Sequence, residues 1–159
     1  MKKRLILPAL VLGSLMAQEP FSEWTIPTPN SQPHCVVSDS RGRIWYAAMG
    51  ANQVGVFDPA TQEFREVRTP TLNSRPHGIA VDSDDTIWFT EQAGNKIGKV
   101  TTSGTFTEYS VPTASSQPEG ITAGPDGNLW FTEFNKNKDR KSTRLNSSHI
   151  QKSRMPSSA

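Results

Sequence analysis

Two histidines and a glutamate recur at one position of a repeated sequence pattern, and their side chains are the best candidates for binding a ligand. His34, His77 and Glu119 each follow a proline at the start of a short run that suits a β-strand. Imidazole and carboxylate groups exchange protons and hydrogen-bond to polar ligands. If the three runs lie side by side, these groups face a common axis and contact one ligand. The alternative is that they bond loop backbone in every repeat, the commoner role of repeated polar residues.

Three further residues carry reactive groups. Glu91 and Glu133 end matching Trp-Phe-Thr-Glu segments, and we expect them to be hydrogen-bond partners within the repeat rather than catalytic acids. Cys35 is the single cysteine, so no intramolecular disulfide is possible. Its neighbour His34 should point to the opposite face of a strand, which predicts a buried structural thiol without a basic partner. The sequence contains no Ser/His/Asp set, no metal-ligand spacing and no phosphate-binding loop.

The elements that carry these residues repeat with steps of 43 and 42 residues. Five sets of residues share this period: Trp45, Trp88 and Trp130; Pro33, Pro76 and Pro118; Phe21, Phe64 and Phe106; Pro27, Pro70 and Pro112; Asn52, Asn95 and Asn137. A period in the low forties is typical of a propeller blade. A helical repeat is disfavoured because no 3.6-residue periodicity accompanies the fixed prolines.

Each repeat unit predicts four short strands. The units span residues 32–71, 75–113 and 117–138. In the second unit we expect strands over 78–81, 87–90, 96–100 and 105–109, from their apolar or alternating patterns. Turns separate them at 83–85 and 102–104. The fold class predicted is therefore all-β, a β-propeller of four-stranded blades with the tryptophans packed between blades.

The segment before the first unit resembles the fourth strand of a blade. Residues 21–28 match the outer-strand segments that begin at Phe64 and Phe106. In a closed propeller such a strand completes the last blade. The third unit stops at Lys138 inside an expected strand, so we expect about two and a half blades and this closing strand within residues 21–138.

The repeats resemble those of one known family. PHGIAVDSDDTIWFTEQAGNKIG and PEGITAGPDGNLWFTEFNKNK are similar to repeats of the streptogramin B (virginiamycin B) lyase family, and the resemblance covers residues 21–138. It implies a seven-bladed propeller that is a monomer at full length. The motif is specific for this propeller superfamily and less so for lyase activity.

The resemblance also implies an activity. Lyases of this family open cyclic depsipeptide antibiotics at an ester bond by elimination. A base removes the proton next to a carbonyl, the acid half of the ester leaves as a carboxylate, and Mg²⁺ stabilises the enolate-like charge. A histidine serves as general acid or base. Because those residues lie in later repeats of the family, we assign no catalytic residue, metal ligand or cofactor to this chain, and expect Mg²⁺ only in the whole protein.

Two other functions stay open. One is an exported, non-catalytic propeller that binds a small molecule or peptide. The other is a lactonase-like hydrolase, which needs a metal held by Glu, Asp and Asn. The first unit departs from the family pattern, because Tyr46-Ala47-Ala48 replaces Phe-Thr-Glu.

The two ends of the chain read differently from the repeats. Basic residues at 2–4, an apolar run over 5–16 and Ala17 predict a signal peptide over residues 1–18 and export to the periplasm or outside the cell. The run is too short for a transmembrane helix, so we expect no membrane association once the signal is removed. Residues 139–159, DRKSTRLNSSHIQKSRMPSSA, resemble a translated sequencing adapter, so we expect a non-native tail.

The tail distorts the charge balance. The chain has 17 basic and 15 acidic residues and a formal charge of +2. Five of the basic residues and one acidic residue belong to the tail, which leaves 12 basic and 14 acidic residues in 1–138. The chain without its tail is therefore mildly acidic, and no nucleic-acid partner is expected.

Overall fold

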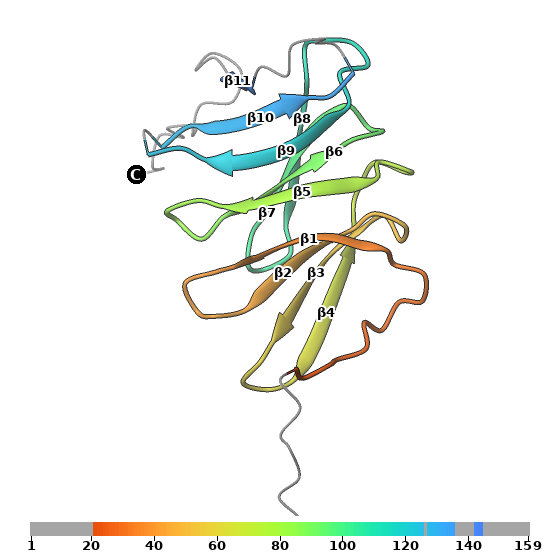
Figure 1. Cartoon of the computed structure of the whole chain (residues 1–159), viewed down its shortest axis with the longest axis vertical. Coiled ribbons are helices and arrows are strands. Elements are labelled where there is room, and N and C mark those ends of the chain that lie inside the picture. Colours follow the sequence, from red (N-terminus) through yellow and green to blue (C-terminus); the bar gives the residue numbers. More distant parts are fainter. Residues whose placement is uncertain (1–20, 126, 136–141, 145–159) are drawn as a thin grey trace, which may run out of the picture.

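The computed structural model describes residues 21–125 and 127–135, together with the backbone of 142–144. These residues form three antiparallel sheets stacked one behind the other, with their inner strands β1, β5 and β9 side by side (Figure 1). No helix occurs among the residues described. The arrangement confirms the all-β prediction and the division into blades.

The strands follow the repeat. The first blade consists of β1 (Pro33–Ser38), β2 (Ile44–Ala48), β3 (Gln53–Asp58) and β4 (Glu63–Arg68). The second consists of β5 (Pro76–Val81), β6 (Ile87–Glu91), β7 (Lys96–Val100) and β8 (Phe106–Ser110). The third contains β9 (Pro118–Ala123), β10 (Leu129–Glu133) and β11 (Ser142–Arg144). In each sheet the neighbours along the chain pair antiparallel.

An aspartate closes the first turn of each complete blade and orients its tryptophan. Asp39 follows β1, and its carboxylate accepts hydrogen bonds from two backbone N–H groups of the turn and from Trp45 Nε1 at 2.9 Å. Asp82 repeats the arrangement with Trp88 Nε1 at 3.0 Å. Short polar side chains commonly bond the backbone two residues on in turns. The repeated tryptophan is thus fixed by the turn before its strand.

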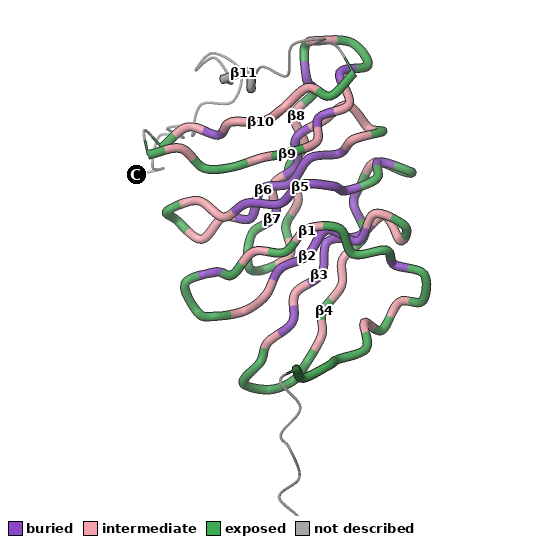
Figure 2. Tube along the Cα trace, in the orientation of Figure 1, coloured by how far each residue is buried: buried purple, intermediate pink, exposed green. Residues whose placement is uncertain are grey.

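The core lies between the blades. Trp45 and Val54 of the first blade pack against Ile79, Phe89 and Val100 of the second. A second cluster joins the second and third blades: Trp88, Ile97, Val111, Leu129 and Phe131. Buried residues are therefore concentrated in the middle sheet (Figure 2). This packing confirms that Trp45 and Trp88 are core residues.

Residues 21–28 form no strand in this structure. A strand needs a hydrogen-bonded neighbour, and the first sheet ends at β4. The segment instead packs on the first blade: the rings of Trp24 and Phe57 lie 5.0 Å apart, and the Thr28 hydroxyl donates to Glu66 at 2.7 Å. Its role as a closing strand stays a prediction.

The expected signal peptide lies outside the described residues. So does the expected non-native tail, apart from the backbone of β11, which pairs with β10. Within the described part of the chain, no helix is long and apolar enough to cross a membrane.

Candidate functional site

Each inner strand carries an irregularity at its start. The register of β1 against β2 shifts between Pro33 and Val36, and that of β5 against β6 shifts between Pro76 and Ile79. The pairing of β9 with β10 shifts at the equivalent place. A β-bulge redirects a side chain and is common beside binding sites. The repeated histidine and glutamate position falls within this bulge in all three blades.

The bulges bring the three candidate residues into contact, and we call His34, His77 and Glu119 the His–Glu row. The ring centroids of His34 and His77 lie 3.6 Å apart with the planes 37° from parallel. His77 Nε2 lies 3.4 Å from Glu119 Oε1. One row therefore crosses the starts of β1, β5 and β9. Its role in binding a ligand stays a prediction.

The central histidine is buried and electrostatically constrained. His77 is 7 % exposed, whereas His34 is exposed. Burial and the adjacent His34 lower the pKa of His77, and they outweigh the carboxylate of Glu119, which acts in the opposite direction. His77 is therefore neutral at pH 7. Its Nδ1 has no hydrogen-bond partner among the described residues.

Cys35 lies beside the row rather than apart from it. His34 Nδ1 is 3.3 Å from Cys35 Sγ, so the expectation that His34 points to the other face is wrong. The physical reason is the bulge, which breaks the alternation of side chains along β1. Burial, and then the negative charge of Glu119, raise the pKa of the Cys35 thiol. The thiol is therefore protonated at neutral pH, but Cys35 is partly buried rather than buried as expected.

Threonines on the second strands hold the bulges in place. Thr90 Oγ1 accepts from the Gly78 N–H at 2.8 Å and donates to the Glu119 carbonyl at 2.7 Å, which ties two blades together. Thr132 Oγ1 accepts from the Gly120 N–H at 2.9 Å. A Cβ atom at Gly78 would collide with the Glu119 carbonyl oxygen. The repeated Pro-x-Gly and Phe-Thr-Glu segments mark the glycine and the threonine of this contact in the sequence. The sequence does not show which atoms bond to each other.

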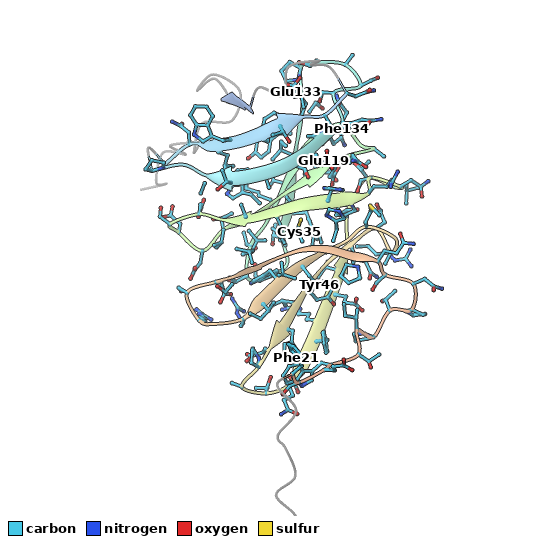
Figure 3. The ribbon with its side chains drawn as sticks, in the orientation of Figure 1. Phe21, Cys35, Tyr46, Glu119, Glu133 and Phe134 are labelled. Carbon is cyan, nitrogen blue, oxygen red and sulfur yellow. The ribbon has the colours of Figure 1, made fainter. Side chains whose placement is uncertain are left out.

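The two strand-terminal glutamates have different environments. Glu133 accepts a hydrogen bond from the Thr113 hydroxyl at 3.2 Å, as expected of a repeat partner. Glu91 is fully buried, and neither of its oxygens has a hydrogen-bond partner within the described chain. Figure 3 shows Glu119 on β9 and Cys35 on β1, on the two sides of β5, with Glu133 at the end of β10.

The described residues do not fit a magnesium ion. No three His, Cys, Asp or Glu side chains among them gather closely enough to hold a metal. The His–Glu row offers hydrogen-bonding groups but no ligand set for a hard cation, which prefers several oxygen atoms. No chemical step through Mg²⁺ is therefore derived for these residues.

Two hollows in the surface lie away from the row. A cavity of about 40 Å³ separates the first two blades and includes Arg43, Arg65 and Gly104 in its lining. A more open cleft of about 260 Å³ includes Arg41, Asp85 and other residues of the turns at the opposite ends of the strands. Neither contains a member of the His–Glu row.

The family follows from a match along nearly the whole sequence. Residues 8–89 and 79–158 match the model of the virginiamycin B lyase family. The chain belongs to the virginiamycin B lyase family. A search of curated proteins found no match.

Solved structures of this family agree with the fold. Selenomethionine-substituted virginiamycin B lyase from Staphylococcus aureus is 38% identical, with a TM-score of 0.74 over 81% of this chain and 43% of its own. A catalytically inactive variant of that enzyme with quinupristin is 34% identical, with a TM-score of 0.71 over 82% of this chain and 46% of its own. The chain thus spans less than half the length of the lyases it matches.

A more distant solved structure shares the fold alone. Hydrazine synthase from Kuenenia stuttgartiensis is 16% identical, with a TM-score of 0.54 over 83% of this chain and 38% of its own. At this identity the likeness concerns the fold and not the activity.

Proposed function

We propose that this chain is the blade-forming N-terminal part of a lyase propeller and that its His–Glu row forms part of the wall that contacts a cyclic depsipeptide. In this proposal the chain binds and orients the ligand. The base, the acid and any Mg²⁺ ligands are placed by the family resemblance in later repeats, and none of the described residues is assigned these roles. The observation that carries the proposal is the meeting of three equivalent polar residues from three blades.

The chemistry of the row suits a neutral, amide-rich ring. Glu119 offers a carboxylate that accepts hydrogen bonds, and His34 offers an exposed imidazole. Depsipeptide rings present amide N–H and carbonyl groups that pair with such partners. The family relative with quinupristin supports this ligand class.

A second candidate is a propeller that binds its ligand without transforming it. This candidate rests on the same meeting of His34, His77 and Glu119, since hydrogen-bonding groups from three blades can hold a ligand without taking part in chemistry. For either candidate we propose export by the signal peptide and a small-molecule or peptide partner.

Binding of quinupristin to the full chain tests the proposal. Isothermal titration calorimetry should detect binding to the parent chain, and Glu119→Gln and His34→Ala should each weaken it about tenfold, the loss of about 1.4 kcal/mol. Mass spectrometry of the mixture should show intact quinupristin, since no catalytic group is assigned to the described residues.

The matched control is Thr102→Ala, an exposed residue at the opposite ends of the strands, which should bind like the parent. Absence of binding by the parent chain would exclude this ligand class. Appearance of ring-opened quinupristin would show that residues of this chain perform the elimination themselves.

A further inference from the structure

Glu91 places a fully buried carboxyl group at the end of β6. Its side chain is 0 % exposed, and neither oxygen accepts a hydrogen bond from the described residues. The β6–β7 turn closes over it, so that a Cβ added at Gly94 would lie 2.9 Å from Glu91 Oε2 and 3.2 Å from the Ser74 Cβ. An ionised carboxylate without donors is strongly disfavoured at such a place.

A second carboxyl group and a lysine share this environment. Lys96 on β7 is the ladder partner of Glu91, and its Nζ lies 2.7 Å from Oε2 of Glu108 on β8. Burial first, and then the charge of Glu108, raise the pKa of Glu91 to about 8 despite the opposing charge of Lys96. Although burial opposes it, hydrogen bonds from Lys96 and Thr71 lower the pKa of Glu108. One of the two carboxyl groups therefore keeps its proton at neutral pH.

The ionised member of the pair holds the linker between the first two blades. Glu108 accepts hydrogen bonds from the Thr71 N–H at 3.0 Å and from its hydroxyl at 2.8 Å. Lys96 Nζ also reaches the Thr71 hydroxyl at 2.7 Å. Residues 69–75 of this linker run directly into β5, which carries His77. Contacts at Glu108 therefore fix one point of the linker that leads into β5.

The first blade contains the same contact between a linker threonine and an outer-strand glutamate, but without a buried acid beside it. Thr28 bonds to Glu66 as Thr71 bonds to Glu108, but Ala48 stands where the second blade has Glu91. The hydroxyl of Tyr46 reaches Glu66 at 3.0 Å instead. The two blades therefore share the threonine–glutamate contact and differ in whether a buried acid lies beside it.

We propose that Glu91 is a protonated acid at neutral pH and that its neutral state leaves the contacts of Glu108 with Thr71 and the linker 69–75 intact, as a pH-responsive latch beside the His–Glu row. Loss of that proton adds a second negative charge that repels Glu108, and Lys96 is the cation beside the pair among the described residues. The linker is then released, and with it the start of β5. This property of the fold is independent of the proposed ligand binding, and the experiments below use the chain without a ligand.

The direction of the pH dependence follows from linkage. The ordinary pKa of a glutamate is 4.5, and that of folded Glu91 is raised to about 8. The folded chain therefore holds a proton that the unfolded chain has released. The stability that this proton contributes is complete below the unfolded pKa and is lost as the pH rises from there through about 8.

The first experiment is a titration of the full parent chain, observed at the glutamate side-chain carbonyl carbons by NMR. One glutamate should titrate with a midpoint about three pH units above the others. Its signal should disappear in Glu91→Gln. If every glutamate of the folded parent chain titrates near its ordinary pKa, the proposal is overturned, whether or not the variant folds.

The second experiment compares thermal unfolding of the parent chain and Glu91→Gln from about pH 5 to about pH 9. The Gln side chain keeps the shape and a hydrogen-bond donor without a titrating proton. The parent midpoint should fall with rising pH, and the variant midpoint should fall less. Glu66→Gln in the first blade is the matched control and should keep the parent slope. Equal slopes for the parent and Glu91→Gln would contradict the latch.

Discussion

At the scale of residues, the equivalent outer-strand glutamates of the two complete blades accept hydrogen bonds from different donors. Glu108 is bonded by Lys96, whereas the equivalent Glu66 is bonded by the hydroxyl of Tyr46. The ring of Tyr46 reaches Glu66 across Gly55, which has no side chain. A Cβ atom at this position would occupy the space of the ring. The departure of the first unit from the Phe-Thr-Glu pattern therefore has a structural explanation at its tyrosine.

Removal of that hydroxyl tests the explanation. Tyr46→Phe should lower the free energy of unfolding by about 1 kcal/mol, because Glu66 loses a hydrogen bond in a largely buried place. Urea denaturation followed by tryptophan fluorescence measures the change. Tyr109→Phe is the control, since the Tyr109 hydroxyl has no hydrogen-bond partner among the described residues and its ring stacks on Trp88. An equal loss in both variants would assign the effect to ring packing.

At the scale of elements, an asparagine in the β2–β3 turn and another in the β6–β7 turn each connect their blade to the following linker by hydrogen bonds. Asn52 adopts a φ of 59°, and its Oδ1 accepts from the Ser74 N–H at 2.7 Å and from the Ser74 hydroxyl at 2.9 Å. Asn95 bonds Ser116 in the same way at 2.7 Å and 2.8 Å. Asparagine tolerates the left-handed conformation that these turns require. The spacing of Asn52 and Asn95 in the sequence thus marks a repeated connection between blades, and Asn137, at the next step of the repeat, lies outside the described residues.

Two substitutions separate the conformation from the hydrogen bonds. Asn52→Gly keeps the positive φ and loses the side chain, so it should cost about 1–3 kcal/mol of stability, mainly because the buried Ser74 N–H is left without its acceptor. Asn52→Asp keeps the acceptor and should cost less. Equilibrium denaturation of the parent chain and of the two variants measures these differences in the free energy of unfolding. If Asn52→Gly is as stable as the parent, the connection contributes nothing.

At the scale of the whole molecule, one blade face remains partly open. Val36 on β1 is 67% exposed, whereas the equivalent Ile79 on β5 is 8% exposed because the first blade covers it. Blade faces of this kind are stable when stacked on a neighbour. The face around Val36 is therefore suited to pack against another blade.

We expect the full chain to self-associate through this face as its concentration rises. Val36→Glu should shift the association to higher concentration, because a charge on the face opposes its burial. Light scattering across a dilution series measures this. Leu72→Glu is the control, since Leu72 is 81% exposed but lies on a linker. A parent chain that stays monomeric throughout would contradict the expectation.

The sequence by itself determined the blades. Each strand signal is local, because alternation of side chains, turn residues and the repeated tryptophan lie within one unit. The same period identifies His34, His77 and Glu119 as equivalent positions. What repeats in sequence also repeats in backbone geometry, which is why the equivalence held.

Only the tertiary structure decided what those positions touch. The contact of His34 with Cys35 depends on a bulge between two strands, and the need for glycine at Gly78 depends on a carbonyl of the next blade. The isolation of Glu91 depends on which groups reach it from β7 and β8. These properties arise from distances between segments far apart along the chain, and a pattern within one repeat does not contain them.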